Sequence, residues 1–503
     1  MSDARDPLAT DHLVDDLKAR SVRGGALTVA AQVLKYGVDI AAIAVLARLL
    51  TPGDFGLVAM VAAVVGFLAA FKDAGLSAAT IQREKVSHAQ VSTLFWVNVA
   101  ASFALSIIIA AIAPGVAWFY GEARLVGITI AMGSGFIFAG LMAQHLALIK
   151  RQMRFRALAW VEVGAHVVAA VAGVAAALAG WGYWALVVRG VTSSFVQMIA
   201  VWVVEPWRPD RPRRAAGAGS LLRFGGYITA FQAVNYVGRN LDNVLIGRVL
   251  GGATLGIYSK AYQLLMLPLR MVNGPISGVA LPALSRLQSD PERLRSYYYK
   301  ALALIVTLSM PVVAWVASVA DSVVLTMLGP QWVEAIDIFR ILTIPAFIGT
   351  FNVATGWVFV ALGHVRRQML SGIANTAVGA VAIVVGLRWG IEGVAWALVV
   401  SSALRRLPTI AYCYHGTPFT LADLFAVLWR PATAALLAGA ATFHIHAAFA
   451  PGTWPPLALA ASFPIFAAVY LGALLALPGG RERVAELIGH ARLLRGRPAE
   501  ALG

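Results

Sequence analysis

Residues 223–262 read RFGGYITAFQAVNYVGRNLDNVLIGRVLGGATLGIYSKAY, an apolar stretch that also carries charged and amide side chains. A related stretch lies exactly 200 positions earlier in the chain. Aligned without a gap, residues 23–56 and 223–256 share eight identical positions. These are Arg23/Arg223, Gly25/Gly225, Ala30/Ala230, Gln32/Gln232, Tyr36/Tyr236, Arg48/Arg248, Leu50/Leu250 and Gly56/Gly256. The match predicts that the chain contains an internal duplication.

The polar residues of both stretches have helical spacing. In the first stretch they are Gln32, Lys35, Tyr36 and Asp39, at i, i+3, i+4 and i+7 on one helix face. In the second stretch they are Gln232, Asn235, Tyr236, Arg239, Asp242 and Asn243. A charged side chain at the bilayer centre costs about 2.5–3.5 kcal/mol. We therefore expect both stripes to face a protein-lined or aqueous interior.

The composition is that of a membrane protein that crosses the bilayer many times. Hydrophobic residues make up 59% of the chain, charged residues 13%, and the mean hydropathy is +0.76. A soluble domain carries about 25% charged residues. The single cysteine, Cys413, excludes an intrachain disulfide and a cysteine-based zinc site. Residues 1–23 are polar, without the apolar segment of a cleaved secretory signal; Leu13, Val14 and Leu17 fit either a short surface helix or a frayed tail.

Apolar runs of about 20 residues predict fourteen transmembrane helices. The predicted spans are 24–50, 55–71, 91–113, 125–149, 157–180, 184–204, 225–250, 256–284, 301–328, 335–362, 369–387, 393–412, 424–447 and 456–478. Turn signals separate them at 51–54, Pro114-Gly115, Gly251-Gly252 and Gly329-Pro330. Most Lys and Arg residues then fall in segments on the side of the N-terminus, while the outer loops hold only Arg124 and Arg388. By the positive-inside rule both termini are cytoplasmic, and the net charge of +16 needs no nucleic-acid partner to explain it.

The predicted organisation is an all-α membrane protein with two six-helix lobes around a central cavity. It comprises a cytoplasmic N-terminal segment 1–23, an N-lobe 24–204, a basic linker 205–222, a C-lobe 223–415, two further helices in 416–480, and a cytoplasmic tail 481–503. Six helices return the chain to its starting side, so the two repeats are parallel. The outer loops are too short to contain a soluble catalytic domain, and the sequence predicts no enzyme activity.

Six charged residues are candidates for a transport site. Lys35 beside Asp39 fits a phosphate-attracting cation next to an ion-coupling carboxylate, or an ion pair that locks two helices. Arg239 holds the repeat position of Asp39, so the two side chains could meet across the cavity, and Asp242 follows one turn later. Lys260 and Arg270 lie on a helix with prolines at 268, 275 and 282, which we expect to bend. That helix suits a moving anion site, although Lys260 could instead reach outward to the interface.

Other polar groups fit structural roles. Glu162 with His166, and Gln144 with His145, could carry protons or form hydrogen-bonded packing pairs. Glu334, Asp337 and Arg340 fit an interfacial cluster, and Arg48 and Arg248 fit snorkelling at outer helix ends. His444 and His446 point to opposite sides of one helix and have no nearby ligand partner. The sequence therefore predicts no metal site and, without a phosphate-binding or dinucleotide motif, no cofactor.

Five segments together resemble the polysaccharide-transport flippases, the Wzx-type branch of the multidrug/oligosaccharidyl-lipid/polysaccharide exporter superfamily. They are LARLLTPGDFGLVAM (46–60), KDAGLSAATIQRE (72–84), QHLALIKRQMRF (144–155), DNVLIGRVLGGATLGIYSKAYQLLMLP (242–268) and GPISGVALPALSRLQSD (274–290). The resemblance runs from about residue 24 to 415, and none of its motifs is catalytic.

The resemblance implies two six-helix bundles that alternate between inward-open and outward-open forms in a bacterial inner membrane. The implied cargo is a polyprenyl-diphosphate-linked oligosaccharide for exopolysaccharide, capsule or O-antigen. It further implies that cations hold the diphosphate (here Lys35, Arg239, Lys260 and Arg270) and that Asp39 and Asp242 couple transport to an ion. Membrane lipids are partners, polysaccharide polymerase and chain-length proteins are further candidates, and a monomer is expected. Asn98, Asn352 and Asn375 are candidates to line a passage for the sugars.

Two other functions stay open at this point. A drug/cation antiporter of the same superfamily would favour a cavity dominated by carboxylates, whereas cations here equal or outnumber acids. A membrane-bound polymerase or ligase would be expected to present a large outer loop with convergent reactive side chains, and the sequence shows none.

Overall fold

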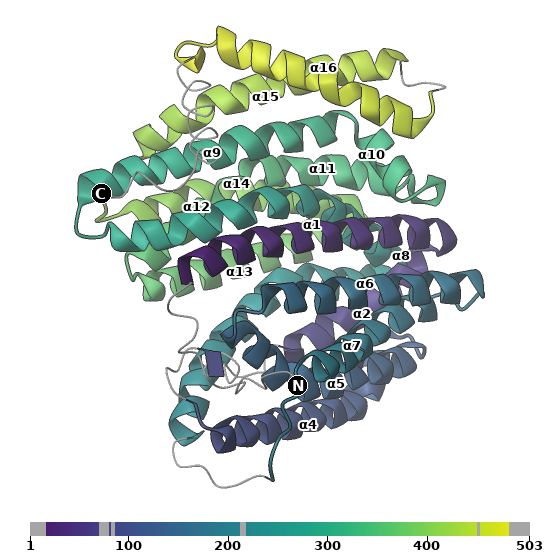
Figure 1. Ribbon diagram of the computed structural model, residues 1–503. Helices are drawn as coiled ribbons and strands as arrows, with labels where there is room; N and C mark the ends of the chain where they lie inside the picture. The colour runs from purple at the N-terminus through teal and green to yellow at the C-terminus, as the bar shows by residue number, and fades with distance from the viewer. Residues whose placement is uncertain (1–16, 70–79, 82–85, 212–217, 450–452, 482–503) are drawn as a thin grey trace. The chain divides into compact units, whose positions relative to one another are not determined.

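The computed structural model describes residues 17–69, 80–81, 86–211, 218–449 and 453–481, and every regular element in them is a helix (Figure 1). The elements are α1 (Leu17–Leu49), α2 (Pro52–Ala69), α4 (His88–Tyr120), α5 (Leu125–Arg151), α6 (Phe155–Leu178), α7 (Trp184–Val204), α8 (Ala218–Arg286), α9 (Pro291–Ser318), α10 (Ala320–Met327), η2 (Pro330–Trp332), α11 (Ala335–Ile348), α12 (Asn352–Ala361), α13 (Val365–Gly386), η3 (Leu387–Trp389), α14 (Gly390–Tyr414), α15 (Leu421–Phe449) and α16 (Pro455–Ala476). The predicted all-α class is confirmed.

Twelve helical segments among the described residues are long and apolar enough to cross a membrane. Two of these, Gly238–Arg286 and Val365–Tyr414, contain 49 and 50 residues. At 1.5 Å per residue each is about 75 Å long, more than twice the roughly 30 Å of a bilayer core. The first breaks at Gly251, whose φ of 86° and ψ of 176° are not helical, and the second comprises α13 and α14. Counting each as two crossings gives the fourteen that the sequence predicts.

Local sequence explains most helix ends. Between α1 and α2, Asp54 Oδ2 accepts hydrogen bonds from the backbone N–H of Thr51 at 2.9 Å and from its hydroxyl at 2.7 Å.

The predicted end of a helix at Pro114-Gly115 is wrong, because α4 continues through Pro114 to Tyr120. A membrane helix tolerates a proline when the apolar run continues beyond it. The helix stops instead at Gly121, which adopts the left-handed conformation with φ of 70°.

Two predicted spans are each divided into two helices. The run 301–328 is interrupted at Val319, between α9 and α10, and the run 335–362 is interrupted between α11 and α12. In α8, by contrast, Gly251 is the residue with non-helical dihedrals, and the helix continues through Pro268, Pro275 and Pro282. The three prolines, at which a bend was predicted, therefore do not break the helix.

The described part of the basic linker is held against the helices before it. The backbone N–H of Asp210 donates to Ser92 Oγ at 3.0 Å, and Trp96 Nε1 donates to the Asp210 carbonyl at 2.8 Å. Nearby, Arg154 Nη1 donates to Glu205 Oε2 at 2.8 Å, and burial raises the pKa of the Glu205 carboxyl. Residues 212–217 lie outside the described residues, as do 1–16 and 482–503 at the predicted cytoplasmic ends.

The chain forms two compact units, Met1–Gly256 and Ile257–Gly503. The first unit contains α1 to α7 and the first part of α8, so it extends beyond the predicted lobe boundary at 205–222. The second unit has a continuous apolar core contributed by the second part of α8 and by α9, α12, α14, α15 and α16. Its members include Leu302, Trp357, Ile410, Ala434 and Phe466.

Within the first unit, α2 and α8 touch backbone to backbone through glycines. A Cβ on Gly56 would lie 1.7 Å from the Gly252 carbonyl oxygen, and a Cβ on Gly256 would lie 1.9 Å from the Pro52 carbonyl oxygen. These two contacts are equivalent at the offset of 200 residues, since 52 corresponds to 252 and 56 to 256. The duplicated stretches therefore meet at this point in a reciprocal, two-fold manner.

We expect Gly56→Ala and Gly256→Ala each to destabilise the protein by about 2 kcal/mol or more, because a backbone carbonyl cannot move aside for the added methyl group. Thermal unfolding of the purified protein in detergent measures this. Gly115→Ala is the matched control: no atom lies within 4 Å of its added Cβ, and it should be neutral or slightly stabilising in helix α4. Equal melting temperatures for all three variants would contradict the close contact.

Candidate functional site

Asp39, one of the two proposed ion-coupling carboxylates, has a partner that the sequence did not reveal. Arg189 Nη2 on α7 donates to Asp39 Oδ1 at 2.5 Å, and both side chains are about one quarter exposed (23% and 26%). Asp39 lies ten residues before the end of α1, about 15 Å along the helix, so its carboxylate is deep in the predicted span. The described contacts thus pair Asp39 with Arg189 and include none with Arg239.

Glycine on a neighbouring helix places Arg189 within reach of α1. A Cβ on Gly173 of α6 would lie 2.8 Å from the Arg189 Cβ, so the bare backbone lets α7 approach closely. An arginine within the apolar span 184–204, five residues after its start, was the available sequence signal. Sequence spacing could not select this residue, since residues 39 and 189 are brought together only by tertiary packing.

Lys35 lies one turn before Asp39 on α1 and is partly exposed. Its ammonium group forms no hydrogen bond or ion pair with any residue that the structure describes, so the predicted alternative of a Lys35–Asp39 lock is not present. With Asp39 neutralised by Arg189, the α1 face keeps one uncompensated positive charge at Lys35.

The first part of α8 carries the corresponding polar face of the second repeat. Tyr236 donates its hydroxyl to the Ala62 carbonyl on α2 at 3.0 Å, where Gly66 leaves room for the ring. Arg239, one turn further, is exposed and has no hydrogen bond or ion pair within the described part of the chain. Asp242 is partly buried, and its Oδ1 accepts from the backbone N–H of Asn243 at 2.8 Å. The side chains of Gln232 and Asn235 lie outside the described residues.

In the second unit, Lys260 and Arg270 lie on the second part of α8. Lys260 Nζ donates to Gln263 Oε1 at 2.8 Å. Arg270 is exposed and has no ion pair or hydrogen bond with a described residue. The first unit contains Lys35, Asp39, Arg239 and Asp242, and the second contains Lys260 and Arg270. Each set is described within its own unit. Their convergence on one cavity remains a prediction.

The remaining polar groups have structural partners. Thr80 donates to Gln144 Oε1 at 2.8 Å, His145 Nε2 donates to the Trp207 carbonyl at 3.2 Å, and His166 Nδ1 donates to the Glu162 carbonyl at 2.8 Å. Each of these side chains therefore has a hydrogen-bond partner, but Gln144 does not bond His145, and His166 bonds the backbone rather than the carboxylate of Glu162. Arg340 and Asp337 form the expected surface pair at 3.7 Å, and the Arg248 guanidinium lies 5.7 Å from the Phe119 ring centroid.

Two expectations are corrected. His446 does have a partner, because its Nε2 lies 3.0 Å from Asp321 Oδ1 on α10, a contact between segments 125 residues apart. Asn98 is only 1% exposed and lies against α5, so it is not available to line a passage for sugars. Among the described residues, no group of three or more His, Cys, Asp or Glu side chains could hold a metal ion.

A family model described as "Polysaccharide biosynthesis protein" matches residues 45–337, which is more than half of the chain. The chain belongs to the polysaccharide biosynthesis protein family. The match covers α2 to α7, both parts of α8, and α9 and α10, including the glycine contact and Arg189. It confirms the family resemblance of the quoted segments.

Named relatives of the family are similar over most of their length. The chain is 23% identical over 376 residues to the lipopolysaccharide biosynthesis protein WzxC of Escherichia coli, covering 74% of this chain and 76% of that protein. It is 26% identical over 418 residues to the succinoglycan biosynthesis transport protein ExoT of Rhizobium meliloti, covering 80% and 82%.

Solved structures share the fold at low identity. The lipid II flippase MurJ in an inward closed conformation has a TM-score of 0.63 and 13% identity, with 91% of this chain and 97% of that chain covered. An inward-facing MATE multidrug resistance transporter of the MOP superfamily has a TM-score of 0.53 and 14% identity, covering 78% and 94%. With twelve apolar helical segments of membrane-spanning length among its described residues, this family member is a multi-pass membrane protein, and it has the fold of these transporters.

We expect Arg189→Ala to lower the free energy of unfolding by about 1–2 kcal/mol, between the values for exposed and buried ion pairs, because it leaves Asp39 without its cation. The double variant Asp39→Asn/Arg189→Ala should recover part of that loss, since no carboxylate is then left unpaired. Thermal unfolding of the single and double variants in detergent gives the interaction free energy between the two side chains. Arg239→Ala, at an exposed residue without a described partner, should change stability by less than about 0.5 kcal/mol. If the two single substitutions lowered the free energy of unfolding by amounts that simply added up in the double variant, the Asp39–Arg189 pair would be contradicted.

Proposed function

We propose that this protein is a flippase that moves polyprenyl-diphosphate-linked oligosaccharide repeat units across the bacterial inner membrane for surface polysaccharide synthesis. Support comes from its family and from its transporter fold. The relatives WzxC and ExoT are named for lipopolysaccharide biosynthesis and succinoglycan biosynthesis transport. Lipid II, named for MurJ, is the cargo of a protein with the same fold.

The charges left over after pairing are the observation that carries this proposal. Asp39 is neutralised by Arg189, whereas Lys35, Arg239 and Arg270 have no described counter-charge. Two unit charges 4 Å apart attract by about 4 kcal/mol at an effective dielectric constant of 20, so convergent cations would hold a diphosphate strongly. A drug/cation antiporter needs accessible unpaired carboxylates, and Asp39 is not one. The charge balance therefore favours an anionic cargo.

Coupling to an ion follows from the same pair. Protonation or sodium binding at Asp39 would weaken its attraction to Arg189 and release one more cation within the first unit. Asp242 is the second coupling carboxylate in this proposal. Cytoplasmic termini, a monomeric state, and cooperation with polymerase and chain-length proteins complete the proposal.

A strain lacking this gene should accumulate lipid-linked repeat units in its membrane and lose surface polysaccharide. Complementation with Arg239→Ala should fail to restore export at wild-type protein levels, because the anion site loses a cation. Arg248→Ala is the matched control on the same helix, and it should restore export. Extracted lipid-linked glycan and surface polysaccharide are quantified together. Normal export by Arg239→Ala would count against the anion site, and a deletion strain without accumulation would refute the flippase.

The double variant Asp39→Asn/Asp242→Asn should transport without responding to proton or sodium gradients, or not at all, because neither site can then change charge. Export is followed in cells or vesicles while each gradient is collapsed separately. The variant must first reach the membrane in wild-type amounts. Transport with an unchanged gradient dependence would remove the coupling proposal and leave the cargo proposal standing.

A further inference from the structure

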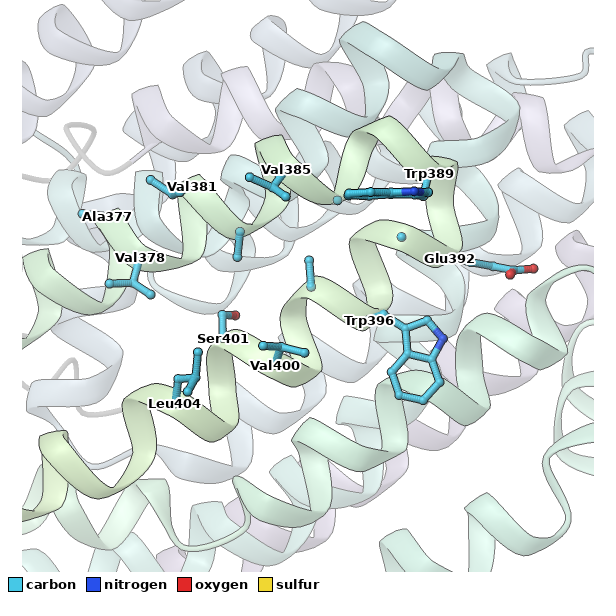
Figure 2. A pocket seen from close by; sticks show the side chains of 14 residues that line it. Ala377, Val378, Val381, Val385, Trp389, Glu392, Trp396, Val400, Ser401 and Leu404 are labelled. Carbon is cyan, nitrogen blue, oxygen red and sulfur yellow. The ribbon is translucent and has the colours of Figure 1, made fainter.

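A long apolar groove runs between α13 and α14 in the second unit (Figure 2). Its volume is about 800 Å³, within the range of about 300–1,000 Å³ that holds small-molecule ligands. Apart from Glu392 and Ser401, its lining consists of Ala, Val, Leu, Gly and Trp side chains. Figure 2 shows Trp389, Trp396 and Glu392 at one end and Ala377, Val378 and Leu404 at the other.

The two helices touch at the end of the groove near Trp389. A Cβ on Gly386 would lie 2.5 Å from the Gly393 carbonyl oxygen, and a Cβ on Gly393 would lie 2.3 Å from the Gly386 carbonyl oxygen. This contact closes the groove at the end that the predicted topology assigns to the outer side. A ligand in the groove must therefore extend from this closed end toward the middle of the membrane.

Arg405 lies beside the opposite end. It donates from Nε to the Ser401 carbonyl at 3.0 Å and from Nη1 to the Asn375 carbonyl on α13. Its guanidinium thus links the two helices and bonds Ser401, which lines the groove. Nη2 has no hydrogen bond, and the guanidinium has no carboxylate partner, among the residues that the structure describes. Its positive charge is hydrogen-bonded but not compensated.

The depth of Arg405 makes this arrangement unusual for a purely structural arginine. It lies nine residues before the end of α14 at Tyr414, or about 13 Å along the helix. An ionisable residue at such depth generally faces a pathway or a ligand. Cross-helix hydrogen bonds account for Nε and Nη1 but leave the net charge and Nη2 unexplained.

The charges at the two ends give the groove a direction. Glu392 lines the closed end, and Arg405, beside the other end, would attract an anion. The matching ligand is an amphiphile with an anionic head at Arg405 and an apolar chain that extends toward Trp389. A lipid of the cytoplasmic leaflet has this orientation.

We propose that the α13–α14 groove binds the polyprenyl chain of the lipid-linked cargo, with its diphosphate at Arg405. This inference rests on the proposed function and adds a second site for the cargo, which binds both tail and diphosphate and is distinct from Lys35, Arg239, Lys260 and Arg270. The cargo then has a defined binding site in the second unit, where its polyprenyl chain is bound by protein rather than by bulk lipid.

Binding of undecaprenyl diphosphate to the purified full-length protein in detergent tests the groove. Val381→Trp fills it and should weaken affinity at least about 10-fold. Val384→Trp is the matched control, because Val384 lies on the same helix, is similarly exposed (55% against 64%) and does not line the groove. Wild-type affinity in Val381→Trp, with Val384→Trp also unchanged, would overturn the proposal.

Arg405→Gln tests the head site, because it removes the charge and keeps hydrogen-bond donors for the two carbonyl groups. It should weaken undecaprenyl diphosphate at least about 10-fold and leave uncharged undecaprenol unchanged, whereas Val381→Trp should weaken both. Equal competition by phosphatidylglycerol would show a site for bulk lipid and overturn the assignment. Cross-linking of two copies through Val381 would identify the groove as a subunit interface and also overturn it.

Export in cells separates this inference from the proposed function. If the deletion strain accumulates lipid-linked repeat units but Val381→Trp restores export and binds normally, the groove assignment fails and the flippase stands. If the deletion strain accumulates none, the flippase fails, and the binding measurements still report on the groove independently.

Discussion

An ionised side chain inside a bilayer must find a counter-charge, water or hydrogen-bond acceptors, and this requirement governs the interior of both units. Asp39 and Arg189 satisfy it by pairing across α1 and α7. Arg405 satisfies it by donating to two carbonyl groups, which leaves its charge in place. Lys35, Arg239, Arg270 and Arg405 have no carboxylate partner among the residues that the structure describes. In the proposed function, these cations favour an anionic cargo.

Hydropathy and turn chemistry were sufficient to predict the helices, because a bilayer fixes helix length and leaves few alternatives. They predicted the apolar helices and the break at Gly251. They failed at Pro114, where α4 continues, and at Val319, where one apolar run becomes two helices. The apolarity of a segment indicates whether the segment can enter the membrane. It gives little information about where the backbone departs from helical geometry within that segment.

The candidate site was predictable as a set of residues but not as a set of partners. Helical spacing placed Lys35 and Asp39 on one face, yet the partner of Asp39 is 150 residues away. The pairing of His446 with Asp321 was missed for the same reason, since nothing in the local sequence brings α10 to α15. Arg405 went unnoticed because its role depends on a groove that exists only when α13 and α14 are side by side. Charges could be listed from the sequence, but their compensation is a property of packing.

An amphiphilic cargo makes two chemical demands that one kind of surface cannot meet. A diphosphate requires polar, charged surroundings, and a polyprenyl chain requires an apolar surface that excludes water. In the proposed α13–α14 site, Arg405 would meet the first demand and the apolar lining of the groove would meet the second. Head and tail would then be recognised by different side chains of the same helix pair.

The reciprocal contact of residues 52–56 with 252–256 has a geometric consequence for motion. When two equivalent segments each touch the other's counterpart, the local axis that relates them passes between them. Points on an axis are displaced least by a rotation about it, and displacement grows with distance from it. A rotation of α2 against α8 about this axis would therefore displace Gly56 and Gly256 less than the distant ends of the two helices.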